Sequence, residues 1–591
     1  MKKKIVIGII ATLILTSAIG IVGMNFKSKK LTRENFHTDL LGENVYIFSP
    51  DDNPEEIQEV LDSAFLMAEI GQFEDDRYGF YFLPGEYHDI DVPVGFYTQV
   101  AGLGALPTDV KLPSVNCSAR WLGTDDNHIA LCNFWRSVEN MQVTGDSMWA
   151  VSQATDMRRM QIDGDLYLHD EKGWASGGWL SNSNINGVVD SGSQQQWLSR
   201  NNKYSGWVGE NWNEVFAGDD PAGVPTTSWP DHAYSAEDNV PIVREKPFLV
   251  YDEKEGFCIY VSSTKTDAVG ADWLDQEPDH KLIPLSECYV AKDSIDNADT
   301  INQALAKGKD IVFTPGTYQL SDTLKVTRED TILLGLGLAS LEPTEGLPCV
   351  STEANGVTIA GLLFDAGQKE SETLLVMEET EVENANPSLL SDVYFRVGGR
   401  RTDEPCKTKS CLVINQDNVI GDNLWIWRAD HGDQVAWDKN TCANGIIING
   451  DDATMYGLMV EHFQEYQTIW NGNNGRLVMY QSEVPYDVTD ARAWSSHDGS
   501  VAGYSSITVA DSVTDFYGMG IGIYLYNRDA KIPMETAMEV PDAPNVQVKN
   551  IITVMLNGNP GMHHCINQAG NSVTSIGQVA KVLYYCNGDW K

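Results

Sequence analysis

The chain has 591 residues, of which 42% are apolar and 21% are charged, so it can form several hydrophobic cores and is not expected to be disordered. Its 84 acidic residues outnumber 41 basic ones and give a net charge of −43. Because such a charge repels phosphate backbones and polyanionic glycans, it argues against nucleic acid as a partner and favours a neutral polymer.

The first 31 residues predict a targeting segment. Three lysines, Lys2 to Lys4, precede an uncharged run from Ile5 to Gly23, and further lysines follow it. A run of 19 residues lies between a long signal peptide and a short membrane anchor, and small residues near Ser17 permit cleavage without requiring it. We therefore expect an exported chain, either secreted or anchored to the outer face of the cell membrane.

Beyond residue 80, short apolar runs separated by Gly, Asn or Asp predict an all-β fold. Helical patterns are confined to about 54–70 and 300–307, each shortly before a predicted strand. The segments that follow these two helical patterns align with each other. The strings LPGEY and TPGTY match Pro84-Gly85 to Pro315-Gly316, and each is followed by GLG, at 102–104 and at 335–337. The chain therefore contains an internal duplication.

A helix that covers the first coil of a stack of short strands is typical of a parallel β-solenoid, whose terminal coil must be shielded from edge pairing. We predict two tandem right-handed parallel β-helices, at residues 32–250 and 291–591, with short capping helices and a linker region at 251–290. A β-propeller or a β-sandwich is the alternative, which the absence of a blade-length repeat disfavours.

Ten cysteines in an exported chain can form disulfides. The near pairs Cys406 with Cys411 and Cys565 with Cys586 are the candidates, although spacing does not determine connectivity, and free buried thiols are the alternative. No CxxC pair or clustered Cys/His spacing indicates a structural metal.

Residues 423–487 combine tryptophans, tyrosines and two glutamates in a Gly- and Asn-rich background, which suits sugar binding. Glu461 and Glu483 are 22 residues apart, within the ~20–45 residue range of solenoid repeats, so they can stack on neighbouring coils. Strands in such a stack lie ~4.8 Å apart, and repulsion between two buried carboxyls raises the pKa of one of them. A carboxyl that stays protonated near neutral pH can act as a general acid, whereas two solvated glutamates are the alternative.

The strings WIWRADHG, VEHFQEYQTIWNGNNGR and YQSEVPYD, with SGSQQQWLSRN in the first half, resemble glycoside hydrolase family 55. The resemblance extends over almost the whole chain after the leader. It implies two tandem right-handed β-helices and hydrolysis of laminarin-type β-1,3-glucan with inversion of the anomeric carbon, without a metal or another cofactor. Exo action that releases glucose is the commoner habit of the family and is our expectation.

By this resemblance Glu483 is the general acid, Tyr486 lies in the substrate pocket, and Glu461 belongs to the hydrogen-bond and proton-relay network around the acid. Inverting pairs of carboxyls need ~6.5–9.5 Å between them, whereas stacked glutamates would be closer. If inversion holds, Glu461 is not the nucleophile, and the attacking water must be held elsewhere.

In the family this water site is built from amide and hydroxyl side chains of the first β-helix. A glutamine can orient water but cannot take up its proton at neutral pH, so the site needs a relay to a carboxylate such as Glu461. The candidates are Gln153, Ser176, Gln194 and Gln196. For Gln194 and Gln196, an amide ladder that stabilises a coil is the alternative.

Trp425 and Trp427 lie on one side of a strand by the period of two, and with Asp430 they match the family's WxWRAD segment, which lines the glucose-binding cleft. The resemblance implies that the rings stack on sugar and that Asp430 binds hydroxyls, with core packing as the alternative for the rings.

Two other functions fit parts of the pattern. A β-helix polysaccharide lyase would need basic residues or calcium to neutralise a uronate, which the acidic composition disfavours. A non-catalytic adhesin that binds glycans along a solenoid face is the alternative from a different class. We expect a monomeric enzyme that acts on neutral β-glucan and does not bind nucleic acid.

Overall fold

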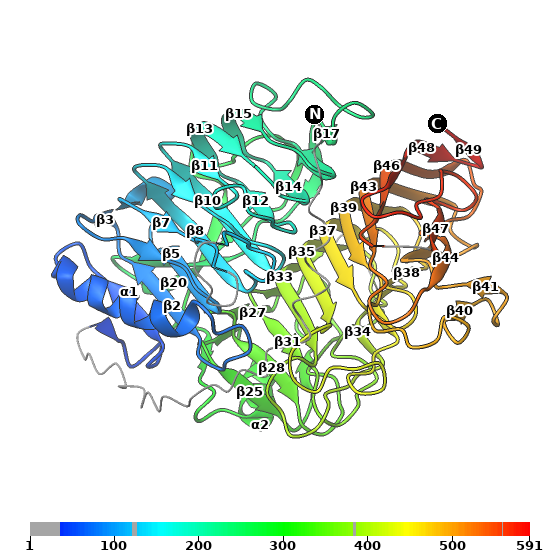
Figure 1. Cartoon of the computed structure of the whole chain (residues 1–591). Coiled ribbons are helices and arrows are strands. Elements are labelled where there is room, and N and C mark those ends of the chain that lie inside the picture. The colour runs from blue at the N-terminus through cyan, green and yellow to red at the C-terminus, as the bar shows by residue number, and fades with distance from the viewer. Residues whose placement is uncertain (1–35, 121–126, 382–385, 558–559) are drawn as a thin grey trace.

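The computed structural model describes residues 36–120, 127–381, 386–557 and 560–591. Within these ranges the chain forms two lobes of short strands, which lie side by side with their sheets facing each other (Figure 1). The predicted leader, 1–31, lies outside the described residues. No helix in the described part of the chain is long and apolar enough to cross a membrane.

The first lobe is a parallel stack in which each strand pairs with the strand one coil further along. Its main sheet contains, in spatial order, β1 (Val45–Phe48), β2 (Tyr78–Phe82), β5 (Thr98–Gly102), β8 (Arg136–Val143), β10 (Thr155–Ile162), β12 (Trp179–Ser181), β14 (Gln196–Arg200), β16 (Asn213–Ala217) and β17 (Tyr234–Glu237). Further strands of the same lobe are β3 (Gly85–Glu86), β4 (Val92–Pro93), β6 (Val110–Leu112), β7 (Val115–Asn116), β9 (Ser147–Met148), β11 (Leu166–Tyr167), β13 (Asn184–Asp190) and β15 (Lys203–Val208).

The second lobe repeats this architecture with two long parallel stacks. The stack facing the first lobe contains β23 (Tyr289–Ala291), β24 (Ile311–Phe313), β27 (Ile332–Gly335), β30 (Thr358–Ala360), β33 (Ser388–Val397), β35 (Val419–Arg428), β37 (Thr454–Glu461), β39 (Gly475–Glu483), β43 (Asp515–Leu525) and β46 (Asn545–Met555). It ends in antiparallel pairing of β46 with β48 (Val579–Cys586) and of β48 with β49 (Asp589–Trp590). The other stack contains β26 (Leu324–Val326), β29 (Val350–Thr352), β32 (Leu375–Met377), β34 (Ser410–Ile414), β36 (Asn444–Ile448), β38 (Thr468–Trp470), β42 (Ile507–Val509) and β45 (Met538–Glu539).

Short strands complete the second lobe. They are β25 (Thr317–Leu320), β28 (Ser340–Pro343), β31 (Leu363–Asp365), β40 (Ser495–Ser496), β41 (Val501–Ala502), β44 (Pro533–Thr536) and β47 (Gly561–His564). The fold prediction of two tandem parallel β-helices is therefore confirmed.

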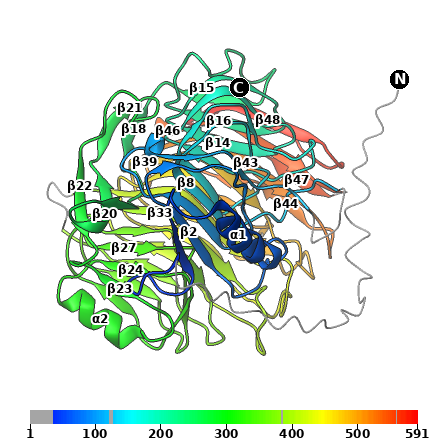
Figure 2. The same cartoon turned by 90° about the vertical axis from the view of Figure 1, so that its left-hand side faces the viewer.

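The predicted capping helix follows the first strand of each lobe. Helix α1 (Pro54–Ala68) starts after Asn53, whose side chain accepts a hydrogen bond from the Glu55 amide, and α2 (Ala298–Ala306) starts with a capping box between Asn297 and Thr300. These side chains satisfy amide groups that have no partner within the helix. Both helices turn their apolar side toward the first coils, at the same end of each stack (Figure 2).

The duplicated glycines occupy equivalent places, because Gly102 ends β5 and Gly335 ends β27. A Cβ atom on Gly102 would lie 2.1 Å from the carbonyl oxygen of Asn140, and one on Gly335 would lie 2.3 Å from that of Gly361. Backbone from a later coil passes so close to both positions that a side chain does not fit, which explains why glycine recurs in the two copies.

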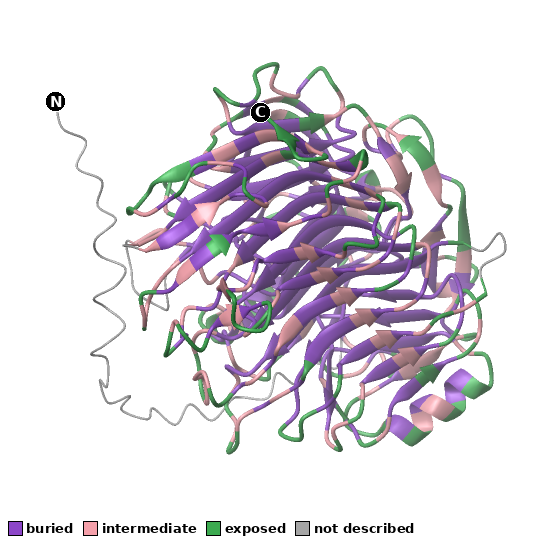
Figure 3. Ribbon diagram, turned by 90° about the vertical axis from the view of Figure 1, so that its right-hand side faces the viewer, coloured by how far each residue is buried: buried purple, intermediate pink, exposed green. Residues whose placement is uncertain are grey.

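Apolar side chains fill the inside of each coil. The strands are mostly buried, and the loops carry most of the exposed residues (Figure 3). The predicted linker region, 251–290, is folded. It includes parts of two small antiparallel sheets, formed by β18 (Val240–Val243) with β21 (Lys265–Ala268), and by β19 (Phe248–Asp252), β20 (Gly256–Ser262) and β22 (His280–Pro284).

Buried ion pairs join the two lobes. Arg158 of β10 donates to Asp392 at 2.7 and 2.8 Å and to Asp422 at 2.8 Å, both of which belong to the second lobe. Arg200 of β14 also bonds Asp422, and it forms a bidentate pair with Glu245 at 2.8 and 2.9 Å. These guanidinium groups are almost inaccessible to solvent and fix how one lobe sits on the other.

The suggested disulfides are wrong, because all ten cysteines are free thiols in the structure. Cys411 lies on β34, whereas Cys406 lies in the preceding loop with its thiol toward Thr402. Cys565 bonds Thr553 inside the lobe, and Cys586 bonds the carbonyl of Pro544. Short spacing along the chain does not bring these thiols together. Among the described residues, no group of three His, Cys, Asp or Glu side chains could hold a metal ion.

Candidate active site

A row of side chains crosses the second lobe on the face that meets the first. Consecutive strands β35, β37, β39 and β43 place Trp427, Glu461, Glu483 and Tyr524 in register. Strands in such a stack lie ~4.8 Å apart, so the two glutamates are nearest neighbours in the row. The predicted stacking of Glu461 on Glu483 is confirmed.

Glu461 is buried, and both of its carboxylate oxygens accept hydrogen bonds. Oε1 accepts from Nε2 of Gln153 in the first lobe at 2.8 Å, and Oε2 accepts from Nε1 of Trp425 at 3.0 Å. Burial raises the pKa of Glu461 to about 7, while the hydrogen bonds from Trp425 and Gln153 favour the ionised form. Glu461 can therefore take up or release a proton near neutral pH.

Glu483 lies at the end of β39 and is partly accessible. Burial, the charge of Glu461 and the charge of Asp430 all raise its pKa well above the ordinary value of 4.5. Since all three causes disfavour the ionised form, Glu483 keeps its proton to higher pH than a solvated glutamate does. A protonated carboxyl beside an ionisable one is the arrangement needed for general acid chemistry.

The first lobe contributes a chain of hydrogen bonds that ends on Glu461. The hydroxyl of Ser176 donates to Oε1 of Gln153 at 2.8 Å, and the amide of Gln153 donates in turn to Glu461. Gln196 lies beside this chain, and its amide nitrogen donates to the carbonyl of Ser176. Its Oε1 is buried and has no hydrogen-bond partner among the described residues, so it remains able to accept from a water molecule.

Gln194 has a different role from the one that the sequence indicated. Its amide nitrogen donates to the carbonyls of Val151 and Leu168 at 2.9 and 2.7 Å, and its oxygen accepts from the backbone of Gly177 at 2.9 Å. The amide is thus fully used in holding adjacent coils together. The prediction that Gln194 orients water is corrected, and the alternative of a structural amide describes it.

Asp430 stands near Glu461 and Glu483 with two imidazoles around it. Nδ1 of His431 lies 2.8 Å from the Asp430 carboxylate, and Nε2 of His462 lies 4.0 Å from it. Although burial opposes ionisation, the charge of His431 holds the pKa of Asp430 well below its usual range. Burial lowers the pKa of His462 to about 4 and keeps that ring neutral. Asp430 is therefore a permanent acceptor, suited to sugar hydroxyls.

Tyr486 packs edge-on against His462, with ring centroids 4.4 Å apart, and against Tyr526 at 4.9 Å. Of these three rings, His462 lies next to Asp430. The structure thus brings Tyr486, as well as Gln153, Ser176 and Gln196, to the part of the seam that holds the two glutamates.

Both predicted stacking residues, Trp425 and Trp427, are 0 and 1% exposed. Their rings stack on each other with centroids 5.0 Å apart and pack against Phe134 and Trp135 of the first lobe. A ring covered in this way cannot lie against a sugar, so the structure corrects that expectation. The two tryptophans form the wall behind the site, and Trp425 holds Glu461.

Sequence reasoning did not single out His431 or Tyr524. His431 adjoins Asp430 in the WRADHG string, and that adjacency was the available signal. Tyr524 follows Glu483 in the row, and its buried hydroxyl has no hydrogen-bond partner among the described residues. Its ring lies over Gly522, where a Cβ atom would be 2.6 Å from the hydroxyl. The string GIGIYL, in which Gly522 precedes Tyr524 by two positions, carried only a weak signal for this contact.

The two facing β-helices hold two neighbouring carboxyls with raised pKa values. Amides, a charged aspartate and aromatic rings lie around them, and this arrangement is that of a carbohydrate-cleaving enzyme. Comparisons with known proteins agree. The LAM55 pectate lyase-like domain matches residues 288–483. An exo-beta-1,3-glucanase of Streptomyces sp. (strain SirexAA-E / ActE) is 39% identical over 541 residues, which are 90% of this chain and 87% of that protein.

Solved structures give the same result. The structure of sacteLam55A from Streptomyces sp. SirexAA-E matches with a TM-score of 0.88 and 37% identity over 92% of this chain and 98% of that one. A single-residue variant of sacteLam55A in complex with glucose matches with a TM-score of 0.85 and 35% identity, over the same shares of the two chains. The chain belongs to glycoside hydrolase family 55. It is a glycoside hydrolase.

Proposed function

We propose that this protein is an exported, exo-acting β-1,3-glucanase that inverts the anomeric carbon, with Glu483 as general acid. The observation that carries the acid assignment is the register of β37 and β39, which sets Glu483 beside Glu461. Burial, Glu461 and Asp430 together raise the pKa of Glu483 there. The β-1,3-glucan substrate and exo action rest on the relative, an exo-beta-1,3-glucanase, and on the glucose bound by the variant of sacteLam55A.

In the proposed reaction, Glu483 gives its proton to the glycosidic oxygen while a water molecule attacks the anomeric carbon. The bond from that carbon to the leaving oxygen breaks, the bond to the water oxygen forms, and the proton released by the water is taken up by Glu461. Ser176 and Gln153 orient the water, since they form the hydrogen-bond chain that ends on Glu461. Gln196 supports them with its free oxygen.

Two features favour inversion over a covalent intermediate. Both Glu461 oxygens are held by donors, one of them from the opposite lobe, which turns the carboxylate away from the role of nucleophile. The amide and hydroxyl of Gln153 and Ser176 come from the facing lobe, so a sugar in the seam can receive the proton and the water from different sides. Asp430 then binds sugar hydroxyls, and Tyr486 borders the pocket.

Export is part of the proposal because the lysine-flanked apolar run from Ile5 to Gly23 has the pattern of a signal peptide or anchor. We propose that the enzyme works outside the cell as a monomer, where a neutral glucan carries no charge that the acidic surface would repel.

The test is Glu483→Gln, which keeps the size of the side chain and removes the proton. We expect kcat on laminarin oligosaccharides to fall about 10²–10⁴-fold, with folding and ligand affinity retained. Calorimetry checks the affinity, and NMR of the parent's first product reports its anomeric configuration. Residual turnover close to that of the parent, in a folded variant, would remove Glu483 from the role. A β-configured product would rule out inversion.

A further inference from the structure

A thiol, an imidazole and a carboxylate follow one another beside the candidate active site. Sγ of Cys132, from the first lobe, lies 4.0 Å from Nε2 of His431, and Nδ1 of the same ring lies 2.8 Å from the carboxylate of Asp430. The proposed reaction uses neither Cys132 nor His431. A nucleophile beside an imidazole that a carboxylate orients is the arrangement by which proteins activate cysteine side chains.

The imidazole of this row carries a positive charge. Although burial opposes protonation, Asp430 raises the pKa of His431 well above its usual value. The thiolate is the form of cysteine that reacts with electrophiles, and a neighbouring imidazolium stabilises a thiolate. Asp430 thus favours the state in which the single proton of the Cys132 and His431 pair rests on the ring.

Cys132 is also accessible. Its side chain is partly exposed, and the ring that it faces borders a cavity of about 460 Å³. The cavity is lined by His431, Phe73 and Gln72, among others, and Nε2 of Gln72 lies 2.7 Å from the same Nε2 of His431 that faces the sulfur. A small reagent therefore has room next to the imidazole that activates the thiol.

The other nine cysteines lack this combination. The structure describes all ten, and of these only Cys132 contacts an imidazole. Seven are buried, among them Cys117, which accepts a hydrogen bond from Arg136 at 3.2 Å but is closed to solvent. Cys288 and Cys586 are partly exposed, but each donates to a backbone carbonyl. Burial raises the pKa of Cys288 to about 12, which keeps that thiol protonated.

We propose that Cys132 is a reactive thiol through which small disulfides inhibit the enzyme reversibly. The inhibition rests on the proposed function, in which Asp430 binds sugar hydroxyls, and disulfides persist in the oxidising surroundings to which the proposed export takes the protein. The Cys132 thiolate attacks one sulfur of the disulfide, so that a new S–S bond forms and the old one breaks. The departing sulfur keeps the electron pair and takes a proton from water. Cys132 is thereby oxidised to a mixed disulfide, and the leaving group is reduced to a thiol.

A group attached to Cys132 disturbs the surroundings of Asp430. The ring of His431 packs against Trp427, with centroids 5.3 Å apart, and edge-on against Phe73 at 5.6 Å. The ring therefore has little room to move away, and an adduct presses on the group that holds Asp430 in place. Because small displacements of a binding group weaken its contacts strongly, we expect sugar to bind less well, with a higher KM.

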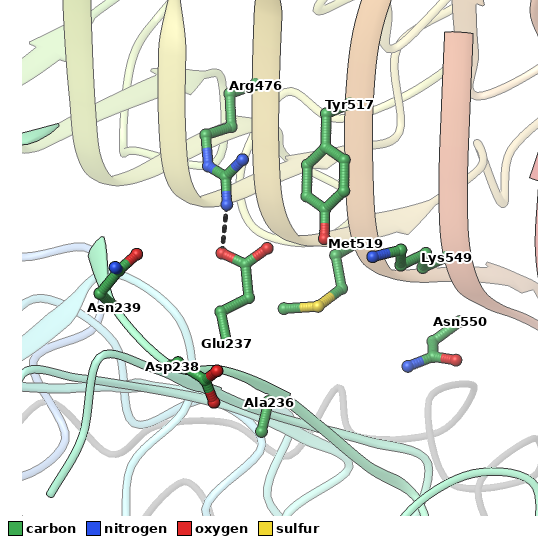
Figure 4. A pocket seen from close by; sticks show the side chains of 9 residues that line it. All are labelled: Ala236, Glu237, Asp238, Asn239, Arg476, Tyr517, Met519, Lys549 and Asn550. Atoms are coloured by element: carbon green, nitrogen blue, oxygen red, sulfur yellow. Dashed lines mark hydrogen bonds and ion pairs between the residues drawn. The ribbon is translucent and has the colours of Figure 1, made fainter. Parts of the chain in front are cut away.

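A second cavity between the lobes, of about 400 Å³, provides the contrast (Figure 4). Its lining includes Lys549 and Arg476, which bonds Glu237, and the only sulfur among its described lining residues is the thioether of Met519. A thioether has no thiolate form and does not exchange with disulfides. A disulfide that enters this cavity leaves no adduct, so loss of activity can be traced to a cysteine.

The experiment treats the folded enzyme with 2-hydroxyethyl disulfide, an uncharged reagent that the acidic surface does not repel. Peptide mapping by mass spectrometry follows the mixed disulfide at Cys132, Cys288 and Cys586, and kcat/KM for laminaritriose is measured on the same samples. We expect Cys132 to react about tenfold or more faster than the other two thiols. The value of kcat/KM should fall roughly tenfold or more as Cys132 is modified, and dithiothreitol should restore it.

Two variants separate the effect of the imidazole from that of exposure. In His431→Gln, the rate at Cys132 should fall about tenfold, while the rate at Cys586 stays that of the parent. Cys132→Ser should keep the kcat/KM of the parent and lose its sensitivity to the disulfide, whereas Cys586→Ser, the matched control, remains sensitive. Melting temperatures show that each variant is folded, and the comparison of the three thiols within the parent requires no variant.

Equal rates at the three thiols of the parent would overturn the activated thiol, and so would an unchanged rate at Cys132 in folded His431→Gln. Full activity of the completely modified enzyme, or equal inactivation of Cys132→Ser, would overturn the inhibition. Failure of the proposed function looks different, because the untreated parent would then hydrolyse no laminarin oligosaccharide while the three thiols still reacted at the expected rates.

Discussion

Two groups of buried acids lie along the same seam between the lobes, and they behave in opposite ways. Asp392 and Glu245 are buried against Arg158, Arg200 and Lys246, and these cations hold the pKa of both carboxyls below the ordinary value despite burial. Glu461 is buried against an amide and an indole, Glu483 is partly accessible beside it, and the pKa values of both are raised. The seam thus contains carboxyls that cations keep ionised, such as Asp392 and Glu245, and carboxyls at the candidate site whose pKa values are raised.

The difference shows that burial alone does not make a reactive acid. Desolvation raises the pKa in all four carboxyls, and in Asp392 and Glu245 the charges of Arg158 and Arg200 outweigh it. The site needs amide and indole donors because they fix a carboxyl in place without forcing it to stay ionised. The cation-paired carboxyls and the carboxyls of the candidate site can be altered separately by substitution.

The largest expected effect comes from removing a cation from the cation-paired carboxyls. In Arg158→Met, Asp392 and Asp422 lose their shared guanidinium and stay buried between the lobes. We expect the free energy of unfolding to fall by about 3–5 kcal/mol, because breaking a buried pair leaves an uncompensated charge. Thermal and urea unfolding measure the change.

Arg492→Met is the matched control, since the Arg492 side chain is 93% exposed beside Asp490. An exposed pair of this kind contributes about 0–1 kcal/mol. If both variants lost the same small amount, the buried pairs would not be what holds the lobes together.

A smaller effect is expected at the carboxyls of the candidate site. Trp425→Phe removes the hydrogen bond to Oε2 of Glu461 with little change in shape. Because that bond favours the ionised form, the pKa of Glu461 should rise from about 7, by about one to two pH units for a bond worth ~1.5–3 kcal/mol. Glu461 must be ionised to accept the proton from water, so the low-pH limb of the kcat/KM profile moves to higher pH.

Trp427→Phe is the control for this prediction, because Trp427 stacks on Trp425 without donating to Glu461. Its low-pH limb should remain near that of the parent. A shift of equal size in both variants would mean that loss of packing, not loss of the donor, changes the profile.

The sequence predicted the parts of this arrangement that depend on one lobe. The spacing of 22 residues placed Glu461 against Glu483, and helix and glycine patterns located the start of each β-helix. Contacts between the lobes could not be predicted from the sequence, since Gln153 and Glu461, for example, are 308 positions apart. Strand periodicity put Trp425 and Trp427 on one face, but only the opposite lobe decides whether that face is open.

The run from Gln194 to Gln196 illustrates the same limit within one lobe. Alternation puts both glutamines on the same side of the chain. Gln194, however, lies in the turn before β14, and its side-chain amide forms hydrogen bonds with three backbone groups. Gln196 begins the strand and keeps a free oxygen. The difference is one of local backbone geometry, which residue type alone does not carry.

The smallest expected effect concerns Glu214, whose carboxyl has neither a cationic partner nor an amide donor. It is fully buried on β16, and neither of its oxygens has a hydrogen-bond partner among the described residues. Burial, with a further contribution from Glu210, raises its pKa well above 4.5, so the folded protein holds it protonated. In the unfolded chain the same group ionises near its ordinary value.

A group whose pKa is raised by folding contributes stability that is complete below the unfolded pKa and is lost as pH rises toward the folded one. Above pH ~4.5, Glu214 should therefore reduce stability by up to about 1.4 kcal/mol per pH unit. In Glu214→Gln this contribution is absent. Between pH 5 and pH 6, the free energy of unfolding of the variant should therefore rise relative to that of the parent by about 1.4 kcal/mol. Glu171→Gln, at a side chain that is 76% exposed, controls for the substitution. A constant difference between variant and parent at both pH values would show that Glu214 is already ionised in the folded protein, and burial without a donor would then not suffice to keep a carboxyl protonated in this fold.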